Sequence, residues 1–353
     1  MADWETLRSR YLVCLESNDL RAGSAFAEEL VSEGNPLSQV IDEVLRPAQV
    51  DVGRRWQANE VTVADEHAAS AITEAALMAG ASASSPARAI RPGVVVLACA
   101  EGDWHTVPLR MVSAGLTEAG FECVFLGPSV PAAHLQAYLD RLRPVALAVS
   151  CSVAVNLDGV RSCADAAHAA SVPLIVGGRA LGVDNSRART AGADAWGAGP
   201  LDAAAVLNGW IDHPPTTFAT PSVADDVQVP AQAELSLVED ASIALLRGQI
   251  AALSDYDDPR WLRTREDIDY IVRFAAAALR FRDRSIFTEF SDWLSAVLAA
   301  RDVPRTVLVR SYQAIAASLP DRHAAIRELI AGVAARVGAP DQGPGSSQCS
   351  GGR

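Results

Sequence analysis

Apolar side chains recur at steps of three and four residues through residues 1–82. This spacing places them on one face of an α-helix, so the region is predicted to be helical throughout. Turn-forming residues at Asn18-Asp19 and Gly34-Asn35-Pro36 divide it into segments. Short turns between amphipathic helices are typical of antiparallel bundles, and we expect residues 1–82 to form a bundle of four helices.

The pattern changes after a short linker at residues 83–92, where apolar runs begin to alternate with amphipathic stretches. Buried strands are expected near 93–99, 121–126, 145–150, 172–176 and 193–196. A helical stretch follows each strand, near 106–119, 131–142, 155–170, 184–191 and 200–212. Strand–helix units of this spacing predict a doubly wound, flavodoxin-like parallel sheet of five strands over residues 93–213.

The remaining chain is predicted to be a linker, a helical domain and a tail. Residues 214–235 contain four prolines and are expected to form an extended linker. Helical periodicity returns over residues 236–338, with helices expected near 236–254, 262–281, 284–301, 305–318 and 321–337. Residues 339–353 are rich in small and polar residues and are expected to be disordered. The fold class is therefore multidomain, α and α/β.

Composition narrows the classes of function. The formal net charge of −13 argues against a direct nucleic-acid partner, because a nucleic-acid-binding face is basic. No apolar run approaches the roughly 18 residues of a membrane span. The N-terminus shows no signal-peptide pattern, so a cytoplasmic location is the expectation. Three histidines, His134, His168 and His213, fall on predicted helices or beside the linker and are expected to lie at the surface.

Polar and small residues follow three of the predicted strands, at the edge where open α/β sheets bind ligands. Asp103-Trp104-His105 follows the first strand, Ser150-Cys151-Ser152 the third, and Gly177-Gly178 the fourth. Neutral imidazole is a good metal ligand, and a carboxylate beside it fixes which ring nitrogen is free to bind. Serines can hydrogen-bond a ligand and glycines leave room for it. The alternative is a generic α/β sheet with an ordinary helix cap and turn at these positions.

This combination resembles the cobalamin-binding domain, whose pattern is Asp-x-His-x-x-Gly, then Ser-x-Leu or Ser-x-Thr, then Gly-Gly. The resemblance implies that His105 is the lower ligand of cobalt, that Asp103 orients it, and that Trp104 belongs to the same site. It also implies that the nucleotide tail of the cofactor enters the sheet domain past the two serines and the two glycines. One departure is Pro108, which replaces a glycine at a place where a first helical turn tolerates proline.

The predicted bundle carries a second pattern, in which Trp56 is followed after nine residues by Glu66-His67. It looks like the Trp-x9-Glu-His motif of adenosylcobalamin light sensors of the CarH type, whose helical bundle caps the upper face of the corrin. The resemblance implies that Trp56 packs on the adenosyl group, Glu66 hydrogen-bonds its ribose and His67 lines the same face. Gln57 stands where many relatives have a histidine that becomes an upper ligand after photolysis, which leaves His67 as the substitute. Without this context, a core aromatic is the ordinary interpretation of Trp56.

Together the two patterns predict a light sensor that uses adenosylcobalamin. Light would break the cobalt–carbon bond, and the cap would lose its contacts with the adenosyl group. The oligomeric state of a homo-oligomer, or its contact with a signalling partner, would then change. The alternative is a corrinoid shuttle protein for methyl transfer, which would use the same sheet and His105 but would not need Trp56 and Glu66. No enzymatic activity is expected.

The C-terminal helical region suggests a second ligand. CarH-type regulators begin with a DNA-binding domain, whereas this chain begins at the cap, so no direct action on DNA is expected. A cap and a cobalamin domain followed by helices resemble photocobilins, which hold both cobalamin and biliverdin. No cysteine lies between positions 164 and 348, so a bilin would bind without a covalent bond. Arginines beside an aromatic-lined pocket suit a flat ligand with carboxylates; the candidates are Tyr270, Arg273, Phe274, Arg280, Arg284 and Tyr312. The alternative is a helical bundle with an aromatic core and solvated arginines.

Overall fold

The computed structural model describes residues 3–84, 91, 93–249 and 257–339. By contact density the chain divides into two compact units. The first consists of Met1–Asp226 together with Ala277–Ile286, and the second of Val227–Ala276 together with Phe287–Arg353. All of the predicted tail at 339–353 except residue 339, and most of the predicted linker at 83–92, lie outside the described residues.

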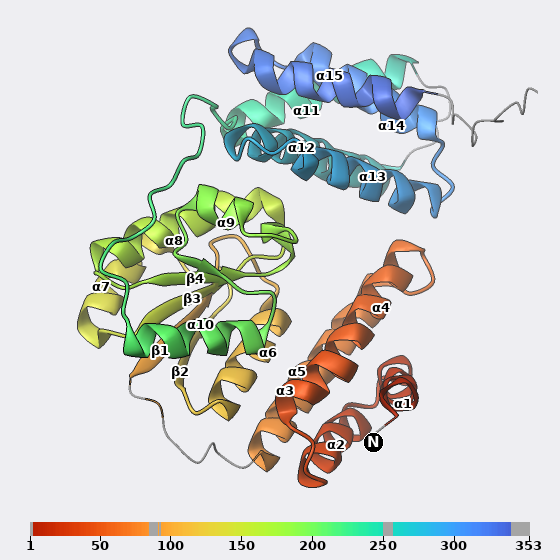
Figure 1. The fold of residues 1–353 in the computed structure, drawn as a ribbon. Helices are drawn as coiled ribbons and strands as arrows, with labels where there is room; N and C mark the ends of the chain where they lie inside the picture. The colour runs from red at the N-terminus through yellow and green to blue at the C-terminus, as the bar shows by residue number, and fades with distance from the viewer. Residues whose placement is uncertain (1–2, 85–90, 92, 250–256, 340–353) are drawn as a thin grey trace, which may run out of the picture. The chain divides into compact units, whose positions relative to one another are not determined.

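The first unit begins with the predicted helical bundle (Figure 1). Its elements are α1 (Trp4–Glu16), α2 (Leu20–Ser32), α3 (Leu37–Val40), the π-helical turn η1 (Ile41–Leu45), α4 (Arg46–Gln57) and α5 (Val63–Ala83). Because α3, η1 and α4 follow one another without a break, the bundle has four helices, as the sequence predicts. Three of the helices have side-chain N-caps. Asp3, Asp19 and Thr62 accept hydrogen bonds from backbone N–H groups in the first turns of α1, α2 and α5.

The core of the bundle extends beyond its own helices. Buried apolar residues of α1, α2, α4 and α5 surround Tyr11, whose hydroxyl hydrogen-bonds Thr73 at 2.9 Å. Met111, from the first helix of the sheet region, is part of the same cluster, and Val107 packs against it. The bundle and the sheet region are therefore joined through one shared helix, α6 (Thr106–Glu118).

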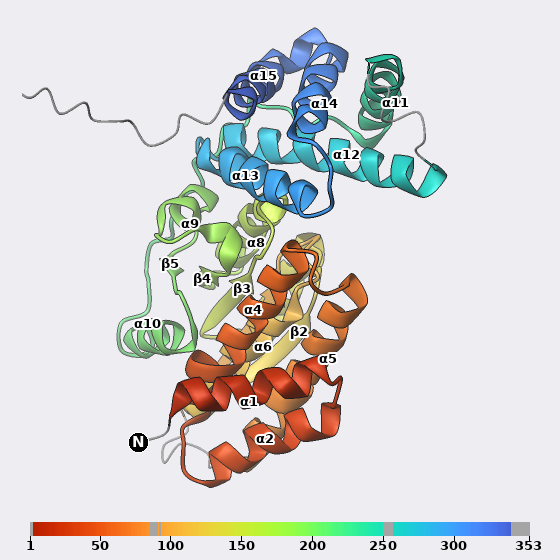
Figure 2. The ribbon, with the colours of Figure 1, turned by 90° about the vertical axis from the view of Figure 1, so that its right-hand side faces the viewer.

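The sheet region has the predicted topology. Its strands are β1 (Val94–Cys99), β2 (Glu122–Gly127), β3 (Ala146–Ser150), β4 (Leu174–Gly177) and β5 (Ala195–Trp196), all parallel and in the order β2-β1-β3-β4-β5. The helices are α6 (Thr106–Glu118), α7 (Ala132–Leu142), α8 (Leu157–Ala169), α9 (Ser186–Ala191) and α10 (Pro200–Asp212). Helices α6 and α10 pack together on one face, and α7, α8 and α9 form the layer on the other (Figures 1 and 2). This confirms the predicted doubly wound fold.

The strand register brings the three predicted motifs to one edge. Cys99 at the end of β1 pairs with Ser150 of β3, and Ser150 pairs with Gly177 of β4. The loops that carry Asp103, Ser152 and Gly178 therefore leave the sheet side by side, which is where parallel α/β sheets place their ligand sites.

Residues 218–224, which the sequence predicts to be part of an extended linker, pack against the sheet region. The ring of Phe218 stacks on His168 with centroids 4.8 Å apart, and the Ala219 amide donates to Asp194 at 2.8 Å. Asp194 also pairs with the His168 ring at 2.9 Å, so His168 is largely covered instead of lying at the surface. The segment packs on the sheet region because it supplies an aromatic ring and backbone donors to buried polar groups there.

The C-terminal region is helical, as predicted. It contains α11 (Gln232–Gln249), α12 (Asp258–Arg280), α13 (Ser285–Ala299), α14 (Arg305–Ser318) and α15 (Ala324–Gly338). The predicted single domain over 236–338 differs from the structure in one respect: residues 277–286 belong to the first unit. Two ion pairs hold this segment to the sheet region, Arg280 with Asp158 and Asp283 with Arg187. None of the described helices has the length and apolar character needed to cross a bilayer.

Candidate functional site

The loop after β1 is held in place by its own backbone. The Asp103 amide donates to the Ala100 carbonyl at 2.9 Å, and the Asp103 carbonyl accepts from the Ser129 amide at 2.9 Å. Gly102 adopts a left-handed φ of 84°, and a Cβ there would stand 2.7 Å from Oδ1 of Asn156. These contacts turn Asp103 inward and place His105 at the N-cap of α6.

Asp103 and His105 form the centre of the site. Oδ1 of Asp103 accepts hydrogen bonds from Nδ1 of His105 at 2.8 Å and from the His105 amide at 2.9 Å, and Oδ2 accepts one from the Ser152 amide. The Asp103 side chain is only 1% exposed. Burial by itself would raise the pKa of this carboxyl, but the donors from His105 and Ser152 hold it below its ordinary value. The aspartate is thus a buried, ionised acceptor.

The geometry leaves one nitrogen of His105 available. The hydrogen bond that the ring donates to Asp103 raises the pKa of the imidazole, and burial acts against this. The charges of Asp103 and Glu66 act in the same direction as the hydrogen bond. The His105 side chain is 58% exposed, and Nε2 has no hydrogen-bond partner among the residues that the structure describes. An imidazole whose Nδ1 is held by a carboxylate presents Nε2 as a metal ligand, so this donor set fits a group that needs one nitrogen from the protein.

Trp104 lies between these two residues in sequence but not in environment. Its side chain is 71% exposed, whereas Asp103 is buried. A large apolar ring left in solvent beside an exposed imidazole is available for contact with a ligand. Pro108 stands at the third position of α6, inside the first turn where the missing N–H costs nothing.

The serine and glycine motifs meet beside Asp103. The structure explains the two glycines by close approach of backbone loops, and not by space for a ligand. Ser150 is buried at the end of β3, and Ser152 contributes its amide to Asp103. Gly178 has a φ of 102°, and a Cβ there would overlap the Cys151 backbone. A Cβ on Gly177 would lie 2.7 Å from the carbonyl oxygen of Gly197. Glycine is therefore required at both positions for the loop after β4 to approach the loops after β3 and β5.

The cap residues lie at one end of a helical hairpin. Trp56 is in the last turn of α4, and Glu66 is in the first turn of α5, after a capping box between Thr62 and Asp65. Oε2 of Glu66 is 2.7 Å from Nδ1 of His67, whose side chain is 76% exposed. Glu66 is close enough to His105 for its charge to act on the imidazole, although Asp103 has the larger effect.

Contacts that the sequence did not indicate join the cap to α6. Thr106, directly after His105, donates its hydroxyl to Glu74 of α5, and Arg110 lies 3.2 Å from the same carboxylate oxygen. Glu66 and Glu74 are eight residues apart on α5, which is roughly 12 Å along a helix axis. Glu74 therefore joins α5 to the residue that follows His105, about two helical turns along α5 from Glu66. No sequence signal marks Glu74, because carboxylates on helices are usually solvated.

Comparison with known proteins agrees with this geometry. Residues 93–205 match the family model described as B12 binding domain. Residues 9–79 match a second model with the same description. The chain is 34% identical over 140 residues to the HTH-type transcriptional repressor CarH of Myxococcus xanthus, a match that covers 40% of this chain and 46% of the repressor. The match thus spans less than half the length of that relative. These matches support cobalamin as the ligand of the first unit.

Three of the solved structures that the chain is similar to are described as corrinoid or cobalamin proteins. A monomethylamine corrinoid protein of Methanosarcina barkeri is 20% identical, with a TM-score of 0.49, over 58% of this chain and 99% of its own. A methanol:cobalamin methyltransferase complex of the same organism is 19% identical, with a TM-score of 0.32, over 59% and 81%. A cobalamin-binding protein of Desulfitobacterium hafniense is 22% identical, with a TM-score of 0.30, over 58% and 98%.

Three of the residues predicted for a bilin lie together in the second unit. Tyr270 is 46% exposed, and its ring centroid is 6.4 Å from that of Phe274. Phe274 in turn stacks on Phe290 at 3.9 Å. Arg273, on the same helix, pairs with Asp269 at 2.7 Å. These residues form an aromatic surface with an ion-paired arginine beside it.

The other predicted bilin residues have different surroundings. Tyr312 is fully buried and donates its hydroxyl to Ser291 at 2.9 Å, which places it in the core of the second unit. Arg280 and Arg284 belong to the first unit, where Arg280 is 2.9 Å from Asp158. The structure therefore divides the predicted set, and the sequence could not show this because both groups share the same helical periodicity.

Proposed function

We propose that the protein is a light sensor that binds adenosylcobalamin through His105. The observation that carries the proposal is a solvent-exposed imidazole held by a buried carboxylate, at the edge where the loops after β1, β3 and β4 leave the sheet. The matches to B12 binding domains and the identity to a CarH repressor support the cofactor class. The spacing of Trp56 and Glu66-His67, which resembles that of adenosylcobalamin light sensors, supports the adenosyl form and the response to light.

Each residue of the sheet edge has a role in this proposal. Nε2 of His105 would bind the cobalt, while Asp103 holds the ring in the tautomer that leaves this nitrogen free. The edge formed by Ser150, Ser152 and Gly177 receives the nucleotide tail. Adenosylcobalamin, when bound, supplies a cobalt–carbon bond that visible light breaks.

The cap distinguishes the adenosyl group. An indole stacks on a purine, and a carboxylate accepts hydrogen bonds from ribose hydroxyls, so Trp56 and Glu66 suit a nucleoside. His67 holds Glu66 in place through its ring nitrogen. When the adenosyl group is absent these contacts are absent, and the cap then favours a different packing. We expect the homo-oligomeric state, or contact with a signalling protein, to follow that change, and we expect no catalytic activity.

Biliverdin is the proposed second chromophore, bound without a covalent bond. The exposed ring of Tyr270 beside the half-buried ring of Phe274 suits a flat ligand. Arg273 on the same helix suits a propionate, provided that the ligand replaces Asp269 as its partner. Far-red absorption by protein purified with biliverdin would support this, and an unchanged spectrum would remove biliverdin from the proposal.

An absorption spectrum recorded in the dark and after green light tests the main proposal. Protein loaded with adenosylcobalamin should change its corrin bands irreversibly, and its size-exclusion profile should shift. Trp56→Ala should keep corrin binding but lose its preference for adenosylcobalamin over methylcobalamin. Trp4→Ala, at a partly buried tryptophan on α1 of the same bundle, is the matched control and should keep that preference. Equal binding of both cobalamins by the unaltered protein, without a response to light, would favour the methyl-shuttle alternative.

A further inference from the structure

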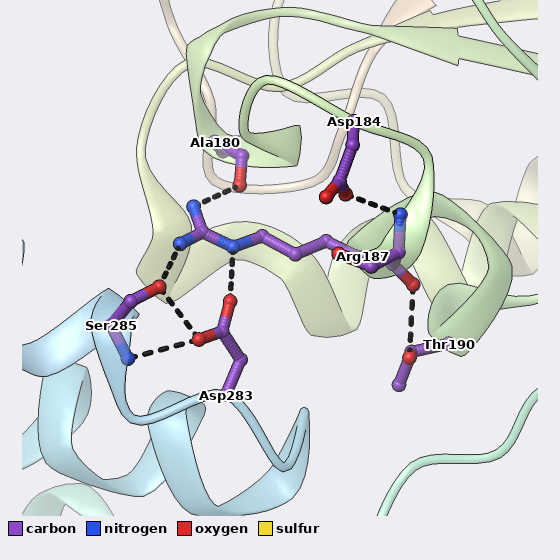
Figure 3. Close-up of polar contacts among 7 residues, drawn as sticks. Ala180, Asp184, Arg187, Thr190, Asp283 and Ser285 are labelled. Atoms are coloured by element: carbon purple, nitrogen blue, oxygen red, sulfur yellow. Dashed lines mark hydrogen bonds and ion pairs between the residues drawn. The ribbon is translucent and has the colours of Figure 1, made fainter.

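Arg187 of α9 is a buried arginine whose guanidinium joins two distant parts of the first unit. Its Nη1 donates to the Ala180 carbonyl at 3.1 Å, its Nε to Oδ2 of Asp283 at 2.7 Å, and its Nη2 to Oγ of Ser285 at 2.8 Å (Figure 3). The side chain is 6% exposed. A planar guanidinium with donors in a fixed fork suits three partners at once. Arg187 therefore ties the loop after β4 to residues 277–286, which we call the anchor segment.

The loop at the Ala180 end belongs to the candidate cobalamin site. Ala180 lies in the short turn η3 (Arg179–Leu181) directly after Gly178, and its amide donates to the Cys151 carbonyl at 3.1 Å. The Cys151 amide donates to the Gly177 carbonyl at 3.0 Å. The loops after β3 and β4 thus share backbone hydrogen bonds, and neither can shift without disturbing the other.

The same two loops are connected to the metal-binding imidazole. Ser152, next to Cys151, donates its amide to Asp103, and Asp103 holds His105. A continuous series of hydrogen bonds and peptide links therefore leads from the imidazole to the anchor segment. Its members are His105, Asp103, Ser152, Cys151, Ala180, Arg187 and Asp283.

The anchor segment is fixed at both of its ends. Asp283 accepts from the Ser285 amide at 2.9 Å at the start of α13; burial works to raise the pKa of this carboxyl, but Ser285 and Arg187 hold it low. Arg280 pairs with Asp158 in the first turn of α8. Helices α12 and α13 continue from this segment into the second unit of the chain. A buried arginine without its carboxylate is costly, so the segment has a strong preference for the docked arrangement.

We propose that Arg187 is a positioning residue that couples occupation of the cobalamin site to docking of the anchor segment. Cobalamin bound at His105 and at the loops after β3 and β4 stabilises the arrangement of Ala180 that Arg187 needs. Docking of the segment in turn stabilises those loops for cobalamin, because coupling between two sites is reciprocal. The inference rests on cobalamin binding, which the proposed function includes, and not on the response to light.

Hydrogen exchange in the dark tests the first half of the coupling. The amides of Asp283 and Ile286 are hydrogen-bonded within the anchor segment and report its opening. Hydroxocobalamin added to the full chain should slow their exchange by about 2- to 30-fold, the range usual for coupling through packed networks. Amides at the start of α1, such as that of Thr6, serve as an internal reference and should not change.

Two substitutions test the second half. Arg187→Lys keeps the charge but loses the fork, and Asp283→Asn keeps the size but loses the charge. Each should weaken hydroxocobalamin binding by about 2- to 30-fold and abolish the slowing of exchange. Arg189→Lys, on the exposed face of the same helix, is the matched control and should behave as the unaltered protein. Thermal melting shows whether each variant folds. If Arg187→Lys fails to fold, the binding and exchange results for Asp283→Asn test the coupling.

The outcomes separate the two proposals. Unchanged exchange in the anchor segment while the spectrum shows bound cobalamin would overturn the coupling and leave the light-sensor proposal standing. Slowed exchange without any response of the adenosylcobalamin form to green light would support the coupling and overturn the light sensor. No binding of any cobalamin would overturn both.

Discussion

Asp103 in the first unit is buried and Asp267 in the second is half-buried, and their surroundings shift the two carboxyl pKa values in opposite directions. Asp103 accepts three hydrogen bonds, two from His105 and one from Ser152, and its pKa is held low despite burial. Asp267, on α12, has no hydrogen bond to its carboxylate among the described residues, and burial raises its pKa to about 6. The donors around a buried carboxylate, and not its burial, decide whether it carries a charge.

Because their pKa values shift in opposite directions, Asp103 can serve a ligand site, whereas Asp267 lowers the stability of the fold at neutral pH. A carboxylate that stays ionised can accept a hydrogen bond from an imidazole and so orient the ring, which is how the partner of a metal-binding histidine acts. A carboxylate that burial keeps close to neutral contributes nothing of this kind, and its ionisation at neutral pH opposes folding. Substitutions at the two positions should therefore act with opposite signs.

The largest effect is expected from Asp103→Asn. The amide group brings a donor to face donors from His105 and Ser152, so we expect the folded state without cofactor to lose about 2–3 kcal/mol. Cobalamin affinity should fall by about 10- to 100-fold, because the imidazole loses its orienting partner. Urea unfolding and spectroscopic titration measure the two quantities. Asp140→Asn, at an exposed position on α7, is the control and should change neither.

The stability lost in Asp103→Asn should depend on pH in a defined way. A depressed carboxyl pKa stabilises the fold above its unfolded value of about 3.9 and is lost as the pH falls. A raised imidazole pKa stabilises below about 6.5 and is lost as the pH rises through the folded value. The difference between the two proteins should thus be largest between about pH 4.5 and 6. A difference that does not vary with pH would show that the ion pair contributes nothing.

An effect of the opposite sign is expected from Asp267→Asn. The raised pKa stabilises the fold only below about 3.9, and this contribution is lost as the pH rises through about 6, so at pH 7 the carboxylate opposes folding. Allowing for partial exposure, we expect the variant to be more stable by about 1–2 kcal/mol at pH 7 and unchanged at pH 4. Urea unfolding at both pH values measures this. Glu328→Gln on α15 is an exposed control; a loss of stability at pH 7 in Asp267→Asn would contradict the prediction.

A third carboxylate, Glu118, sharpens the comparison with the smallest effect. Its two oxygens accept from the amides of Leu37 and Ser38, so a residue of α6 supplies the cap that the N-terminus of α3 lacks. Glu118→Ala should cost about 1 kcal/mol, the usual value of a lost N-cap. The midpoint of thermal unfolding measures it, with the exposed Glu122→Ala as control. If both variants melt alike, the contact between the cap and the sheet region does not depend on this carboxylate.

Much of the first unit could be predicted from its sequence. Apolar runs such as Val94–Cys99 are long enough and buried enough to be read as strands, and the chain order of strands and helices then fixes which ends share an edge. Asp103, Ser150 and Gly177 could therefore be expected side by side from periodicity and chain order. The second unit offered helical periodicity alone, so its helices were predicted correctly while the grouping of its arginines and aromatic residues was not.

The sequence by itself thus determined the elements, the parallel sheet and the residues that meet at its ligand-binding edge, because these follow from local periodicity and from chain order. Only the tertiary structure decided which groups complete the site. The donor to Asp103 from Ser152 is a backbone amide, which every residue but proline carries, so no side chain signals it. Arg187 reaches Asp283 across 96 positions, and in sequence it looks like any solvated arginine. Long-range packing selects such partners, and periodicity carries no information about them.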